Sequence, residues 1–109
     1  ELILRLRAMY PENKVTCSYY GMASVELWNM YEEGKLSGIK RVAKSNSVYR
    51  DGMGHAGDVL MTVAGLVWLN TIYGIDIAKV KPAKVNFKFD YKAVATKVIA
   101  LDKEHNPEK

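Results

Sequence analysis

An uncharged run of 17 residues, 59–75, constrains the fold of this chain more than any other feature. A run of this length lies at the short end of what can span a bilayer as a helix. It contains Thr62, Asn70 and Thr71, and it lacks the flanking lysines that normally orient a membrane span. The run is apolar on nearly every face, as in helices that are buried on most sides. We therefore expect a central buried helix over 56–73, covered by a sheet or by a partner subunit.

The residues before this helix predict a mixture of helix and strand. Apolar residues on one face predict a helix over 1–10, and period-two alternation predicts a strand over 14–20. A second helix is expected over 24–35, with Ser24 as its N-cap. The basic segment 36–48 is thin in apolar residues and is expected to be a loop or a weak strand pair.

The residues after the helix predict a β-hairpin. Four apolar residues alternate with polar ones in the first half (Val85, Phe87, Phe89 and Tyr91), and 92–101 has a strand-like composition. The expected fold is a single α+β domain, 1–109, in which the central helix packs on a small antiparallel sheet. Residues 102–109 are expected to form a flexible tail. Trp28, Tyr31 and Trp68 are expected in the core.

Charge and cysteine content limit the classes of function. The net charge is +4 at pH 7, which favours anionic partners but also fits an ordinary solvated surface. Cys17 is the only cysteine, so neither an intrachain disulfide nor a cysteine-based zinc site can form. No secretory signal is visible in residues 1–7. We expect a cytoplasmic protein without cofactor, metal site or membrane partner, and nucleic acid is a less favoured partner.

The start of the central helix is the candidate chemical site. His55 and Asp58 are three residues apart, beside backbone amides that a helix N-terminus leaves unbonded. His55 is expected to act as a general base or to polarise a carbonyl, with Asp58 orienting it or a water molecule. The expected ligand-binding residues are Arg50, Gly54, Gly57 and Thr62. The simpler alternative is that Asp58 only stabilises the helix dipole.

The run HAGDVLMTVAG resembles the signature that opens the central helix of hotdog-fold acyl-CoA thioesterases. KVNFKFDY followed by AVATKVIAL is similar to paired strands of that family. The resemblance implies a dimer whose sheet wraps the helix, with His55 and Gly57 matching motif residues near a thioester carbonyl. Two departures stand out. Asp58 is an insertion relative to the motif, and Gly65 stands where the catalytic acid of the family would fall.

A second resemblance points to another enzyme class. GDVLMTVAGLV with YGIDIAKV resembles the third helix of MazG-type nucleotide pyrophosphohydrolases, and MYEEGKL resembles their upstream glutamate motif. That family implies Mg²⁺ and nucleotide phosphates bound by carboxylates, although His55 stands here in place of a motif glutamate.

Three functions are therefore carried forward. The first is a homo-oligomer that binds a small acyl or anionic ligand, with hydrolysis of an acyl-CoA thioester as its enzymatic form. The second is Mg²⁺-dependent nucleoside triphosphate pyrophosphohydrolysis. The third is a non-enzymatic interaction module that uses the basic loop 35–50.

Overall fold

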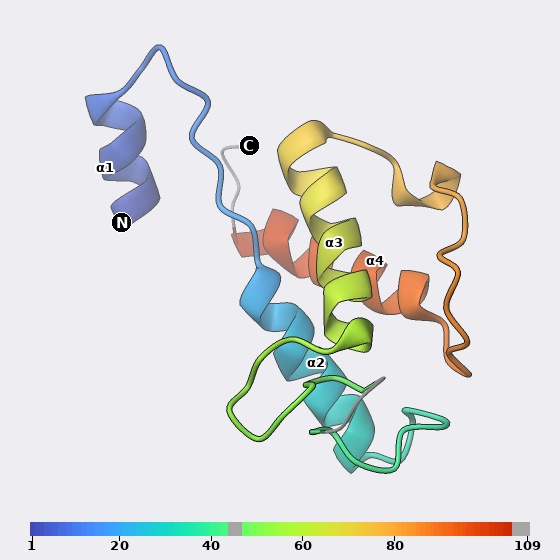
Figure 1. Ribbon diagram of the computed structural model, residues 1–109. Coiled ribbons are helices and arrows are strands. Elements are labelled where there is room, and N and C mark those ends of the chain that lie inside the picture. Colours follow the sequence, from blue (N-terminus) through green and yellow to red (C-terminus); the bar gives the residue numbers. More distant parts are fainter. Residues whose placement is uncertain (44–46, 106–109) are drawn as a thin grey trace.

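The computed structural model describes residues 1–43 and 47–105, and all regular structure in these ranges is helical (Figure 1). The elements are α1 (Leu2–Met9), α2 (Tyr20–Glu32), α3 (Asp58–Tyr73), the short 3₁₀ helix η1 (Ile77–Lys79) and α4 (Tyr91–His105). The described ranges contain no strand, only isolated bridges that join Tyr49 to Ala43 and to Ala56. The predicted α+β fold with an antiparallel sheet, and the hotdog-like architecture with it, is therefore wrong.

Helix α3 is the centre of the molecule and packs against both α2 and α4. Its buried residues include Val59, Val63 and Val67, none of which is exposed to solvent. The helix ends where the sequence indicates, because Gly74 adopts a left-handed conformation with φ of 67°. The helix begins two residues later than in the predicted range 56–73 and ends at the predicted residue. No helix within the described ranges is long and apolar enough to cross a membrane.

Helix α4 replaces the second strand of the predicted hairpin. Its buried apolar residues Val94, Ala95, Val98 and Ile99 recur at helical spacing rather than in alternation. The carboxylate of Asp90 accepts a hydrogen bond from the amide of Ala93 at 3.0 Å, as a helix N-cap does. The prediction followed the β-branched composition of the segment and missed this cap.

The other two predicted strands are also absent. Residues 14–19 run as an irregular connection into α2, which begins at Tyr20, and 80–90 pass along the outside of the helices without a ladder (Figure 1). The alternating aromatic residues of the second segment form a cluster against the core. The rings of Phe87 and Phe89 stack at 5.4 Å, and Tyr91 meets Phe87 edge-on at 6.0 Å. The alternation of apolar and polar residues in this segment therefore reflects the packing of an irregular segment against the core, and not a strand.

Helix α1 stands apart from the others and buries none of its residues (Figure 1). Its connection to the rest of the chain includes a hydrogen bond from Nε of Arg7 to the carbonyl of Val15, at 3.0 Å. Apolar exposure is also high elsewhere. Trp28 on α2 is 44% exposed and Trp68 on α3 is 47% exposed, so the expectation that both lie in the core is wrong.

Two predictions reach beyond the described residues. The basic loop 35–50 includes Lys44, and the tail includes 106–109; these residues lie outside the ranges that the structure describes. Residues 102–105, expected at the start of the tail, form the last turn of α4.

Candidate functional site

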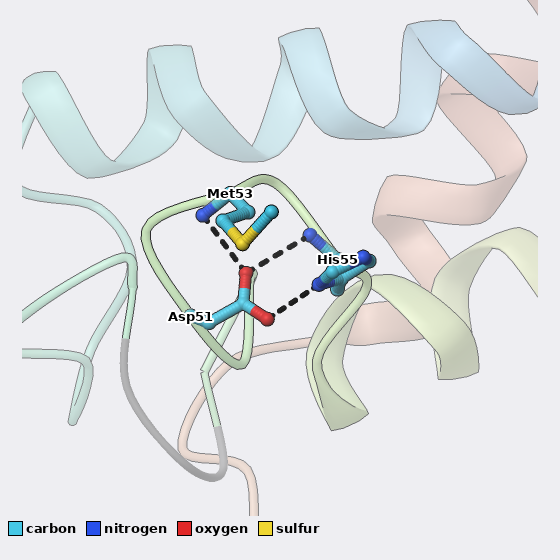
Figure 2. Close-up of polar contacts among 3 residues, drawn as sticks. All are labelled: Asp51, Met53 and His55. Carbon is cyan, nitrogen blue, oxygen red and sulfur yellow. Dashed lines mark hydrogen bonds and ion pairs between the residues drawn. The ribbon is translucent and has the colours of Figure 1, made fainter.

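The loop before α3 holds His55 against an aspartate that sequence reasoning did not single out. Nδ1 of His55 lies 2.5 Å from Oδ2 of Asp51 (Figure 2). The other carboxylate oxygen, Oδ1, accepts hydrogen bonds from the backbone amides of Met53, at 2.9 Å, and His55, at 3.3 Å. The side chain of Asp51 thus closes a tight turn by accepting hydrogen bonds from amides two and four residues later, as aspartates in turns commonly do. The turn-like composition of residues 51–54 (DGMG) was the sequence signal that could have pointed to Asp51.

This contact sets the charge state of the carboxylate. The hydrogen bond from the His55 imidazole, helped by the two backbone amides, holds the pKa of Asp51 below its ordinary value of 3.8. Both side chains are substantially exposed, at 53% for His55 and 36% for Asp51. An exposed pair of this kind is well suited to fixing a loop. It lacks the dry surroundings that strengthen electrostatic catalysis.

The other residues predicted at this site lie around the same loop without converging on His55. Asp58 is the exposed first residue of α3, and no hydrogen bond joins it to His55 in the described ranges. The hydroxyl of Thr62 donates to the backbone carbonyl of Asp58 at 2.7 Å. Arg50 joins the loop through its amide, which donates to the carbonyl of His55 at 2.9 Å, while its side chain is exposed.

Two glycines shape the loop for different reasons. Gly54 has a φ of 85°, a conformation that side-chain-bearing residues rarely adopt. Gly57 has an ordinary φ, but a Cβ at this position would lie 2.3 Å from the carbonyl oxygen of Ser47. The segment 47–49 therefore crosses directly over the entrance to α3.

The same crossing occupies amides at the start of α3. The amide of Gly57 donates to the carbonyl of Val48 at 2.8 Å, and that of Val59 donates to the carbonyl of Ser47 at 3.2 Å. Backbone carbonyls thus take the place that a ligand oxygen would fill at an open helix N-terminus. The expected arrangement, in which first-turn amides polarise a substrate carbonyl, is partly blocked by the protein's own chain.

A concave site lies at the opposite, carboxyl-terminal end of α3. This cavity of about 560 Å³ is lined by residues from four separate segments. We call it the cationic cavity, because Arg7, Lys14 and Lys103 line it and no aspartate or glutamate within 1–43 and 47–105 does. Its other lining residues are Pro11, Asn13, Val15, Thr16, Asn70, Thr71 and Gly74.

Thr71 is the buried polar residue in the wall of this cavity. Only 7% of it is exposed, and its hydroxyl oxygen has no hydrogen-bond partner among the described residues. Leaving a buried hydroxyl unbonded costs roughly 1–3 kcal/mol, so such groups are uncommon in folded proteins. Lys103 is far in sequence from Arg7 and Lys14, and so no local motif marks the cavity.

A second cavity, of about 510 Å³, lies between α2 and α4. Glu26 and Glu33 line it, but each already has a lysine partner. Nζ of Lys97 lies 2.5 Å from Glu26, and Nζ of Lys35 lies 2.6 Å from Glu33. The ammonium group of Lys35 holds the pKa of Glu33 below its usual range. Phe89, Lys88 and Asp90 complete one side of this cavity.

Metal-binding geometry is missing from the part of the chain that the structure describes. No group of three or more histidine, cysteine, aspartate or glutamate side chains there is arranged to hold a metal ion. Comparisons with protein-family models, with curated proteins and with solved structures found no match to this chain.

Proposed function

We propose that this chain binds a small phosphate-bearing ligand in the cationic cavity. The observation that carries the proposal is the cavity's lining, which combines Arg7, Lys14 and Lys103 with no carboxylate from any residue that the structure describes. The volume of about 560 Å³ falls within the roughly 300–1,000 Å³ that is usual for small-molecule sites. Arginine and lysine are the residues that proteins most often use to bind phosphate.

The carboxyl-terminal end of α3 opposes an anion, but weakly. A helix dipole contributes about 0.3–1 kcal/mol within its last turn. Two of the last carbonyls are also bonded already, since Gly74 donates to Asn70 at 2.9 Å and Ile75 donates to Leu69 at 3.2 Å. Each hydrogen bond to a charged group contributes roughly 1.5–3 kcal/mol. Two such bonds from the three cations therefore outweigh the dipole.

Neutral groups add specificity to the cavity. The side-chain amides of Asn13 and Asn70 and the hydroxyl of Thr16 line the wall together with Thr71. A ligand oxygen that reaches Thr71 would give its buried hydroxyl the partner it lacks. A phosphate with a polar substituent, such as a nucleotide, matches this combination better than a purely apolar acyl chain does.

Calorimetric titration with inorganic phosphate, pyrophosphate, ADP and acetyl-CoA tests the proposal. We expect the phosphate compounds to bind and the affinity to fall as salt rises. The double variant Lys14→Glu, Lys103→Glu should bind at least about tenfold more weakly. Lys81→Glu is the matched control, because this exposed lysine does not line the cavity. Equal binding by the double variant, or heat from none of the ligands, would contradict the proposal.

A second candidate is Mg²⁺-dependent nucleoside triphosphate pyrophosphohydrolysis. The helical fold favours it, because the resemblance of α3 to MazG-type enzymes needs no sheet. Glu33, from the MYEEGKL motif, lines the cavity between α2 and α4 with Glu26. These carboxylates do not form a magnesium site as they stand, because each is paired with a lysine.

Pyrophosphate release from nucleoside triphosphates in the presence of Mg²⁺ decides this second candidate. Turnover that is lost in Glu33→Gln but kept in Glu12→Gln would support it. Glu12 is the control, because it is exposed, lies outside the MYEEGKL motif and does not line the cavity. The absence of turnover in the wild-type chain would leave ligand binding as the function.

A further inference from the structure

One face of α3 is apolar and exposed to solvent. Met61, Trp68 and Ile72 are 55%, 47% and 44% exposed, and Gly65 lies between them. Their spacing of four, three and four residues places all four positions on one side of the helix. We call these four residues the apolar face of α3. No charged residue occurs in the helix after Asp58.

Gly65 has no structural reason within the chain. Outside the backbone of its own helix, a Cβ built there would meet no atom of the described residues within 4 Å, and its φ is not positive. Glycine inside a helix costs about 0.8–1 kcal/mol relative to alanine. A glycine at the centre of an exposed apolar face lets another backbone approach closely, and such an approach would account for it.

We infer that a second copy of this chain packs on the apolar face of α3, with a two-fold axis near Gly65. In an antiparallel pair centred there, Met61 of one copy lies opposite Trp68 of the other, and the reverse contact forms by symmetry. Sulfur-to-aromatic contacts of this kind are favourable. The apolar face of α3 is separate from the proposed ligand site, because none of its four residues lines the cationic cavity.

The area that a stable dimer needs brings α1 into the interface. Even a large aromatic side chain offers only about 150–250 Å² in total, so three half-exposed side chains, of which Trp68 alone is aromatic, supply at most roughly 300 Å². A specific interface buries about 800 Å² on each partner. The largest further exposed apolar set is on and beside α1, where Leu2, Leu4, Met9 and Tyr10 are 69%, 52%, 66% and 49% exposed.

Helix α1 therefore covers the second copy. None of its residues is fully buried within its own chain, and it stands away from the other helices (Figure 1). Contributions from α1 and α3 together approach the area of a standard interface, whereas neither helix reaches it alone. The contact surface of α3 is uncharged, so no two like charges meet at the centre of the interface, although each copy carries a net charge of +4.

Sedimentation equilibrium of the full chain over micromolar concentrations tests this inference. We expect a dimer for the wild-type chain and for Met53→Glu, a loop methionine that is 83% exposed and lies off the face. Trp68→Glu and the double variant Leu2→Glu, Met9→Glu should each weaken association at least about tenfold. A monomeric wild type, or unchanged association in both variants, would overturn the inference.

Gly65→Ala separates a lost interface from a lost fold. Alanine meets no atom of its own chain, so the dilute monomer should melt at a higher temperature, while association weakens. A variant that melts higher and associates as tightly as the wild type would place the interface elsewhere. Co-sedimentation of a monomeric wild type with phosphatidylserine–phosphatidylcholine vesicles would assign the face to a membrane surface instead.

Discussion

The two ends of α3 are closed in opposite ways. At the amino-terminal end, the protein's own backbone fills the approach, with segment 47–49 bonded to the amides of Gly57 and Val59. At the carboxyl-terminal end, residues from four separate segments surround a cavity of about 560 Å³. The two candidate catalytic residues that the sequence suggests, His55 and Asp58, are at the closed end. A histidine beside a helix start is therefore a poor guide to a site unless the space around it is known.

The closed end depends on a backbone-to-backbone approach, so it should be the more sensitive to mutation. Gly57→Ala should lower the free energy of unfolding by about 2–3 kcal/mol, because the new methyl group would overlap the carbonyl of Ser47. Chemical denaturation followed by circular dichroism measures this difference. It is the largest effect that we expect from a single methyl group in the loop.

Gly52→Ala is the control for this effect. A Cβ at Gly52 meets nothing within 4 Å, and its φ is not positive, so stability should change by less than about 0.5 kcal/mol. If both variants behave alike, the entrance to α3 is not tightly closed, and the contrast between its two ends disappears.

The open end should respond to polarity rather than to size. Thr71→Val keeps the shape of the side chain and removes a buried hydroxyl that has no partner in the described ranges. The free energy of unfolding should therefore rise by about 1 kcal/mol. Phosphate compounds should bind the variant more weakly, because the hydroxyl is no longer available to them.

Thr62→Val provides the matched comparison on the same helix. The hydroxyl of Thr62 already donates to the carbonyl of Asp58 at 2.7 Å, so its removal should not stabilise the protein. Stabilisation by both substitutions would show only that valine suits α3. Stabilisation by Thr71→Val alone would support an unmet hydrogen bond in the wall of the cavity.

The sequence predicted α1, α2 and α3 as helices, but it mistook α4 and two irregular segments for strands, for physical reasons. The uncharged run, with Gly74 after it, marks a buried helix by local composition alone. Helix α4 was missed because its β-branched residues outweighed the spacing of Val94 and Val98 in the prediction, although Asp90 marks its start. Burial depends on partners, and so the half-exposed Trp28 and Trp68 could not be recognised from residue type.

The candidate site was predictable only in part. The turn at 51–54 and the importance of His55 follow from local sequence, and the structure adds Asp51 as the partner of His55. The cationic cavity was beyond prediction, because Lys14 and Lys103 meet only after α1, α3 and α4 are placed. Side chains that come together from opposite ends of the chain leave no local pattern.

The smallest effect concerns the charge of the loop at the closed end. The His55 imidazole and two backbone amides hold the pKa of Asp51 below 3.8, so the carboxylate is bonded more favourably in the folded chain than in the unfolded one. The resulting stability is present above the unfolded pKa and is lost as the pH falls through the lowered folded value. Carboxyl chemical shifts recorded by NMR across this acidic range should show Asp51 titrating below 3.8. In His55→Ala its pKa should rise towards that value, whereas Asp58→Asn should leave it in place. An Asp51 that titrates normally in the wild type, or that responds to Asp58→Asn instead, would show that His55 is not tied to the loop as Figure 2 draws it, and would return the amino-terminal end of α3 to consideration as an open site.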